Sequence, residues 1–378
     1  MQNTKNAKKE KLTWQEFRNS SSYFDKKSKA LNGTKNALLA IFRFIVIVGI
    51  SYVILAPVIG IISNSFFSRQ DSINPMVFTI PINPTLERYT MAIKYMDYLP
   101  ILGRTVVYVV GITLIQLLIC SMVGYGFARF NFPFKGLLFG CVLVMIVVPL
   151  NTIQFPLYIT FRYFNILPFT IAAAALGLAI AVMGLLDKGK GVRKALMLIA
   201  GLAVLGAGIY FTWQNLAAGH PTPNLLQTPW PTVIMSVFGC GLRSGLYIYI
   251  FNQFFRGLPK EIEEAALVDG ASPGYTYFRI MLPNASPAVI TVAVFSIVWQ
   301  YNDSFFANTF NIPDSILITR KLDSLINVIA NAEKVLTIRE QQLYFDAGVV
   351  LVLVPVVLIY LILQRRFIEG VERSGIVG

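Results

Sequence analysis

Long apolar runs separated by polar segments dominate the pattern along the chain. A helix that crosses a bilayer needs about 20 mostly apolar residues, and about eight runs approach or exceed that length. None of the segments alternates apolar and polar residues as the strands of a membrane barrel do. The pattern therefore predicts an all-α polytopic membrane protein with about eight transmembrane helices. The runs lie at about residues 38–62, 101–127, 137–158, 169–186, 195–213, 231–251, 288–306 and 345–363.

The polar segment between the sixth and seventh runs predicts two short helices. The first covers residues 260–267, with Pro259 near its start, where the missing N–H costs nothing. Asp269-Gly270 should end this helix, because glycine tolerates the left-handed conformation of a C-cap. Ser272-Pro273 is typical of an N-cap and first helical residue, and Leu282-Pro283 should end the second helix. Two amphipathic helices at a membrane surface indicate a docking site for a partner protein.

Composition favours a membrane protein over a nucleic-acid-binding one. Charged residues make up 13% of the 378 residues, whereas soluble proteins carry about 25%. The net charge of +13 is explained by Lys and Arg on the cytoplasmic side of the membrane. The basic residues are dispersed rather than gathered with aromatics, so we expect membrane lipid and no nucleic acid as a partner.

Basic residues also predict the orientation of the chain. Residues 1–37 are rich in lysine and should form a cytoplasmic N-terminal segment, too long and too polar for a cleavable signal. Further basic residues flank the turns after spans two and four and follow span eight. With an even number of spans, both termini and the polar segment 252–285 fall in the cytoplasm. These flanking residues are Arg129, Lys135, Lys188, Lys190, Arg193, Lys194, Arg365 and Arg366.

The sequence carries no pattern typical of catalysis or of a metal site. The three cysteines lie in apolar runs without a C-x-x-C pair, which predicts neither zinc nor disulfides. The one histidine, His220, has no partner for a metal. The run from Gly184 to Gly191 nearly forms a phosphate-binding loop, but Gly191 stands where a hydroxyl residue belongs. A tight turn between two helices is the favoured interpretation there.

One set of spaced residues carries a family resemblance. The spacing EAA, three residues, Gly, nine residues, Ile-x-Leu-Pro resembles the signature loop of binding-protein-dependent ABC importer permeases. An ordinary amphipathic loop would explain the two helices but not this spacing. The resemblance implies that the segment couples the permease to an ATPase. The implied coupling residues are Glu263, Glu264, Ala265, Ala266, Asp269, Gly270, Ile280, Leu282 and Pro283.

Other segments resemble the maltose-type carbohydrate permeases of this family. The run 125–130 is similar to the end of their second core helix, and the tail 364–370 resembles their Q-R-x-F-x-x-G ending. Trp299 and Asn302-Asp303 resemble a Trp-Asn-Asp-x-Phe run, with two residues intervening. The resemblance covers 38–163 and 231–378, and it implies a six-helix ABC importer permease core.

The Ala/Gly-rich pair of runs falls outside that resemblance and is interpreted as an inserted helical hairpin. The expected divisions are a cytoplasmic N-terminal segment (1–37), core spans one to three (38–165) and the inserted transmembrane hairpin (166–230). The rest of the core (231–363) follows, with its cytoplasmic coupling loop at 252–285, and then a cytoplasmic tail (364–378).

Polar residues inside apolar runs are candidates for a substrate pathway. Asn302 and Asp303 near the end of the seventh run could line a sugar pathway or lie at the outer membrane interface, and both alternatives remain open. Aromatic residues nearby could stack on sugar rings or serve as packing and belt residues. The candidate pathway comprises Phe295, Trp299, Asn302, Asp303 and Phe306, with Arg243 as a further polar exception.

The resemblance implies a transmembrane permease subunit in the cell membrane, importing a di- or oligosaccharide by alternating access. Its partners would be a second, homologous permease, cytoplasmic ATP-binding subunits and an extracytoplasmic solute-binding protein that meets the outer loop at 307–342. This chain would itself be no enzyme and need no cofactor, because ATP binds to the partner subunits. The alternatives are a secondary carrier or channel for small polar solutes, and a membrane-embedded enzyme.

Overall fold

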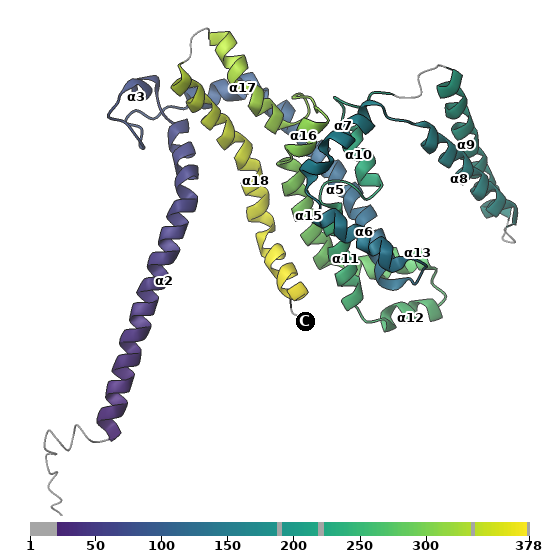
Figure 1. Cartoon of the computed structure of the whole chain (residues 1–378), viewed down its shortest axis with the longest axis horizontal. Helices are drawn as coiled ribbons and strands as arrows, with labels where there is room; N and C mark the ends of the chain where they lie inside the picture. Colours follow the sequence, from purple (N-terminus) through teal and green to yellow (C-terminus); the bar gives the residue numbers. More distant parts are fainter. Residues whose placement is uncertain (1–20, 187–190, 218–222, 334–336, 376–378) are drawn as a thin grey trace, which may run out of the picture. The chain divides into compact units, whose positions relative to one another are not determined.

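The computed structural model describes residues 21–186, 191–217, 223–333 and 337–375 (Figure 1). All regular elements in these ranges are helices, which confirms the all-α fold class. Several sequence predictions lie outside the described residues: residues 1–20 of the N-terminal segment, the hairpin-turn residues Lys188 and Lys190, His220, and the last three residues of the tail.

The chain divides into two compact units, Met1–Pro84 and Thr85–Gly378. In the first unit, the predicted first span lies within one long helix, α2 (Ser21–Ser65). A short helix, α3 (Arg69–Ile73), follows it, and the Ser68 hydroxyl caps α3 by accepting a hydrogen bond from the backbone N–H of Asp71 at 3.1 Å.

The second unit is a bundle built around α5 (Tyr98–Arg129). Along α5 pack α11 (Ser244–Gly257) and α15 (Ser286–Tyr301), and α18 (Ile338–Gly375) packs on α15. The crossing of α5 and α11 is close, because a Cβ atom added at Gly124 would lie 2.6 Å from the Cβ of Phe251. The other helices of the bundle are α4 (Glu87–Met96), α6 (Lys135–Val147), α7 (Gln154–Arg162), α10 (Trp230–Val237), α16 (Phe305–Thr309) and α17 (Ile318–Glu333).

Five helices in the described residues are long and apolar enough to cross a membrane, and two bent helix pairs bring the number to seven. One pair joins α6 to the segment Leu150–Arg162 at an angle of 103°, where Pro149 stops α6 from continuing. The other pair bends by 76° at the start of α15. The chain is therefore a multi-pass membrane protein, with fewer straight spans than the apolar runs predict.

The predicted sixth span, 231–251, is not one helix. It divides into α10 and α11, because the connecting residues leave the helical conformation: Gly239 and Arg243 have φ angles of +69° and +59°. The amide Nε2 of Gln116 donates a hydrogen bond to the carbonyl oxygen of Leu242 at 2.9 Å. Inside an apolar bundle, this bond satisfies a backbone group that the interrupted helix leaves unpaired.

The inserted pair of runs forms a hairpin of α8 (Leu167–Leu186) and α9 (Gly191–Ala217), drawn in teal in Figure 1. Small residues let the two backbones approach closely. A Cβ atom added at Gly208 would lie 2.6 Å from the backbone nitrogen of Ala174. One turn further on, the Thr212 hydroxyl donates to the Thr170 hydroxyl at 2.8 Å. The apolar residues on the outer faces of both helices are exposed.

Leucine at Gly208 is expected to separate the two helices of the hairpin, because its side chain has no room against α8. Cysteines introduced as Thr170→Cys and Thr212→Cys should cross-link in the parent chain and several-fold less in the Gly208→Leu variant. The matched control is Gly206→Leu, since no described atom lies within 4 Å of a Cβ atom there. Equal cross-linking in both leucine variants would contradict this packing.

Candidate functional site

The first helix of the candidate coupling loop is α12 (Glu261–Val268), and it ends as the sequence predicts. Gly270 adopts a φ angle of +84°. The N–H of Ala271 donates to the carbonyl oxygen of Ala266 and the N–H of Gly270 to that of Leu267, both at 3.0 Å. This pair of bonds is a Schellman motif, which requires a left-handed residue at the glycine position.

The second helix begins as predicted but does not end at Pro283. The Ser272 hydroxyl accepts a hydrogen bond from the N–H of Tyr275 at 3.3 Å, and Pro273 is the first helical residue. A π-helical turn, η2 (Thr276–Met281), follows, and then α14 (Leu282–Asn284). Pro283 lies in the first turn of α14, where its missing N–H breaks no hydrogen bond. The chain bends only after α14, into α15.

An acid of α12 fixes the loop to the end of α5. The hydroxyl of Tyr125 donates to Glu263 Oε1 at 2.6 Å, and Nε of Arg129 lies 3.2 Å from Glu263 Oε2. The side chains of Arg129 and Glu263 are only 4% and 15% exposed. Arg129 also donates to the carbonyl oxygen of Leu258 at 2.8 Å, just before α12. The ion pair is therefore largely shielded from water, and it ties α12 to a core helix.

The second helix of the loop is attached to the same face of α5. Tyr277 is buried, and its hydroxyl lies 2.6 Å from the Ser121 hydroxyl. The ring of Tyr125 packs against the rings of Tyr277 and Phe255, with centroids 5.1 and 5.3 Å away. The sequence prediction did not include Ser121, Tyr125 and Arg129 in the site. Their spacing of four residues, which places them on one helix face, was the available signal.

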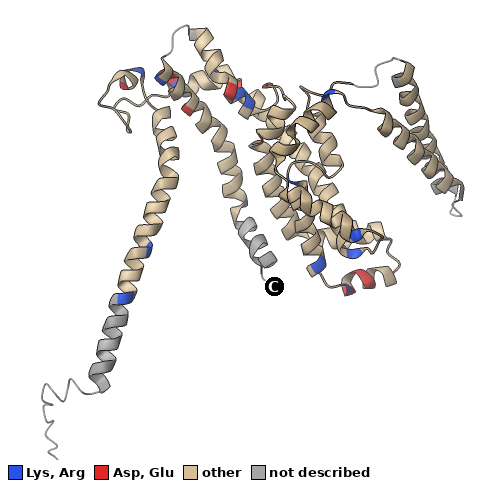
Figure 2. Cartoon of the chain, viewed as in Figure 1, with Lys and Arg blue, Asp and Glu red and all other residues tan. Residues whose placement is uncertain are grey.

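The outer side of the loop stays open to contact. Glu264, Ala265, Asp269 and Gly270 are exposed, whereas Ala266 is buried. Figure 2 shows the acidic residues of α12 together at this end of the bundle. Exposed apolar side chains accompany them, and such a mixed patch is typical of a protein-binding surface. Pro283 is exposed as well, while Ile280 and Leu282 are half-buried. The exposed apolar residues are Ile262, Leu267, Val268, Tyr275 and Phe278.

The candidate pathway residues separate into two groups. Trp299, Asn302 and Asp303 line one pocket of about 320 Å³, together with Arg243. The guanidinium carbon of Arg243 lies 3.9 Å from the centroid of the Trp299 ring. Phe306, in contrast, is buried in the core and packs against another phenylalanine ring.

Phe295 also lies away from this pocket, half-buried against the core around α11. The side chains of Asn302 and Asp303 both form hydrogen bonds with backbone groups of nearby residues. Asn302 Nδ2 donates to the carbonyl oxygen of Val298 at 2.9 Å, and Asp303 Oδ1 accepts from the N–H of Phe306 at 3.1 Å. Phe295 and Phe306 are not among the residues that line this pocket.

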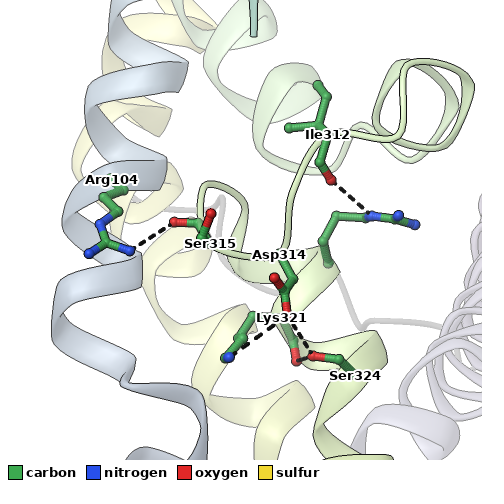
Figure 3. Close-up of polar contacts among 7 residues, drawn as sticks. Arg104, Ile312, Asp314, Ser315, Lys321 and Ser324 are labelled. Carbon is green, nitrogen blue, oxygen red and sulfur yellow. Dashed lines mark hydrogen bonds and ion pairs between the residues drawn. The ribbon is translucent and has the colours of Figure 1, made fainter. Parts of the chain in front are cut away.

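At the other end of the bundle, the segment between α16 and α17 is tied to α5 (Figure 3). Arg104 donates to the carbonyl oxygen of Ser315 at 3.1 Å. Asp314 lies 3.8 Å from the ammonium group of Lys321 and accepts a hydrogen bond from Ser324 at 3.3 Å. A polar pocket of about 520 Å³ opens beside these contacts. Its lining residues include Gln227, Asn311, Asp314, Arg320, Asp323 and Ser324.

These features define a polytopic membrane protein with a helical loop at one end of its bundle, anchored to α5 on one side and exposed on the other. Residues 116–373 match the family of binding-protein-dependent transport system inner membrane components. The chain belongs to this family, as the signature-loop resemblance predicts.

Named relatives agree with this assignment. The chain is 23% identical over 266 residues to the trehalose transport system permease protein SugB of Mycobacterium tuberculosis, covering 70% of this chain and 72% of SugB. It is 22% identical over 325 residues to the diacetylchitobiose uptake system permease protein NgcG of Streptomyces coelicolor, covering 86% and 84%. These relatives are permease components rather than enzymes.

The fold is shared with a chain in the crystal structure of a bacterial ABC transporter involved in the import of the acidic polysaccharide alginate. The TM-score is 0.57 at 17% sequence identity, and the match covers 88% of this chain and 98% of the other.

Proposed function

We propose that this permease subunit imports a di- or oligosaccharide across the cell membrane by ATP-driven alternating access. The observation that carries the proposal is the anchored coupling loop, whose signature residues are held in place by a Schellman turn and by the Glu263–Arg129 pair. The names of the relatives, which include a trehalose and a diacetylchitobiose permease, support a saccharide as the substrate class.

In this proposal, cytoplasmic ATP-binding subunits dock on the exposed face of α12 and bind the ATP themselves. Glu264 is exposed there and offers its charge to the partner. Displacement of α12 reaches α5 through Glu263, because the two helices are joined by a shielded ion pair. Rigid-body movement of helices in this way is a familiar means of alternating access. Both termini and the coupling loop lie on the cytoplasmic side.

A second permease would complete the pathway, and an extracytoplasmic solute-binding protein would deliver the sugar to the opposite end of the bundle. The polar pocket beside Asp314 and Arg320 lies there, on a segment that hydrogen bonds fix to α5. A surface fixed in this way is suited to recognise a partner without a large ordering cost.

The test is reconstitution in proteoliposomes of the full chain with three partners: the second permease, the ATP-binding subunit and the solute-binding protein. We expect the four components to co-purify, and loaded binding protein to stimulate ATP hydrolysis and sugar accumulation together. Accumulation that proceeds without ATP and collapses with an ionophore would support the secondary carrier instead.

A further inference from the structure

Three interrupted helical segments meet at the pocket of about 320 Å³ that contains Trp299. Leu150 lies at the break between α6 and α7, and Leu242 and Arg243 lie at the break between α10 and α11. The third contribution comes from residues 302–304, between α15 and α16. In membrane transporters, interrupted helices bring backbone and side-chain polar groups to substrate sites within the bundle.

The chemistry of the lining suits a sugar ring. Saccharides present an apolar C–H face beside an edge of hydroxyl groups, and the indole of Trp299 offers a flat surface for that face. Arg243 and Asn302 supply planar polar groups around it, and Asp303 adds a carboxylate. Apart from Ser304, the remaining lining residues are apolar, so the pocket combines an apolar surface with a few placed polar groups, as small-molecule sites do.

A larger cavity of about 640 Å³ lies along α5 and is less suitable. It is lined mainly by apolar side chains, including Val107, Ile112 and Val233, which offer no partners for sugar hydroxyls.

A buried polar network holds Arg243 at this pocket. Gln116 is fully buried, and its Nε2 donates to the carbonyl oxygen of Leu242 at 2.9 Å and to the Ser244 hydroxyl at 3.2 Å. The Ser296 hydroxyl donates in turn to Gln116 Oε1 at 2.7 Å. The two neighbours of Arg243 in the chain are thus fixed to α5, and through it to α15. Arg243 itself is exposed, in a left-handed conformation.

We propose that this pocket is a neutral-saccharide subsite of the permease and that Arg243 determines its specificity. Without a sugar, the guanidinium group covers the indole face of Trp299 in a cation–π contact. When a sugar ring binds, it stacks on that face in place of the guanidinium group. The planar guanidinium group then donates hydrogen bonds to the hydroxyl groups of the ring. The pocket holds one cation and one carboxylate, which favours a neutral sugar. The inference rests on the proposed function, because it assumes that a saccharide passes through the bundle.

The experiment uses the reconstituted complex with trehalose, maltose and cellobiose as probes, each supplied at saturating loaded binding protein. Trp299→Leu should lower uptake roughly tenfold, the loss expected when an aromatic stacking surface is removed. Arg243→Lys keeps the charge but loses the fork, so it should change the ratio of the three uptake rates several-fold. The control is Trp213→Leu, on the exposed face of the α8–α9 hairpin, which should transport as the wild type does.

Binding is measured separately, so that a variant with impaired assembly does not decide the result. In a permease with Trp14, Trp213 and Trp230 replaced by phenylalanine, Trp299 is the one remaining indole. The fluorescence emission of Trp299 should change on titration with a probe sugar. The emission spectrum of the sugar-free Arg243→Ala variant should already resemble the spectrum of the sugar-bound protein, because no guanidinium group covers the indole. Unchanged emission, or wild-type uptake rates and ratios in Trp299→Leu and Arg243→Lys, would overturn the subsite while the importer stands. A wild-type complex that accumulates none of the probes with ATP contradicts import of these disaccharides instead, and the emission titration then decides the subsite by itself.

Discussion

Valine in place of Gly270 is expected to abolish ATP-coupled uptake while the permease still inserts in the membrane. Gly270 has a φ angle of +84°, where a β-branched residue is strongly disfavoured. The strain is about 1–3 kcal/mol, enough to open a two-bond Schellman turn on an exposed loop. No described atom lies within 4 Å of a Cβ atom at this position, so the effect comes from the backbone alone. Uptake and stimulated ATPase activity of the reconstituted complex measure it.

The matched control for this prediction is Gly274→Val, a few residues away in the same loop. A Cβ atom there also meets no described atom within 4 Å, and its backbone has no positive φ angle. We expect uptake within about twofold of the wild type, because surface substitutions usually change stability by less than about 0.5 kcal/mol. Gly270→Asn should be intermediate, since asparagine visits the left-handed region. Equal activity of the two valine variants would exclude a conformational role for Gly270.

The second large effect is expected from Glu263→Ala. Removing this acid leaves the guanidinium group of Arg129, 4% exposed, without its ion-pair partner. Removing one partner of a buried ion pair lowers stability by about 3–5 kcal/mol. We expect part of this loss to weaken the attachment of α12 to α5. Basal ATP hydrolysis should persist, whereas stimulation by loaded binding protein should fall at least about tenfold, the change that 1.4 kcal/mol produces.

Two companion variants separate positioning from simple loss of charge. Glu261→Ala removes an exposed acid from the same helix and should leave stimulation near the wild-type level. Tyr125→Phe removes one hydrogen bond to Glu263 and should cost about 1 kcal/mol, a milder loss. If Glu261→Ala and Glu263→Ala reduce stimulation equally, the acids act through net charge and the anchor has no special role.

The coupling loop shows which features could be predicted from sequence. The end of α12 before Asp269-Gly270 and the start of the next helix at Ser272-Pro273 follow from local backbone rules, and both predictions are confirmed. The family assignment also depended on local spacing and is confirmed. The roles of the coupling residues and the domain boundaries stay predictions.

Two expectations about helix ends were wrong, one beside an irregular helical turn and one where a distant segment decides the local conformation. Pro283 was expected to end a helix, but the π-helical turn before it places the proline in a new first turn. The sixth run was expected to be one span, but it is broken where Gln116, far away in the sequence, satisfies the freed carbonyl group. Hydrophobicity identifies segments that can lie in a membrane. It does not show where a side chain of another helix can satisfy the backbone groups that a break in the helix leaves unpaired.

The sequence by itself determined the class, the family and the local turns, because apolar run length, glycine conformation and residue spacing act within a few residues. The tertiary structure decided which of two adjacent acids turns inward: Glu263 meets Tyr125, 138 positions away, while Glu264 stays exposed. It also gathered Arg243 with Trp299 and separated Phe306 from them. Such choices depend on desolvation and packing between distant segments, and the order of residues along the chain does not specify them.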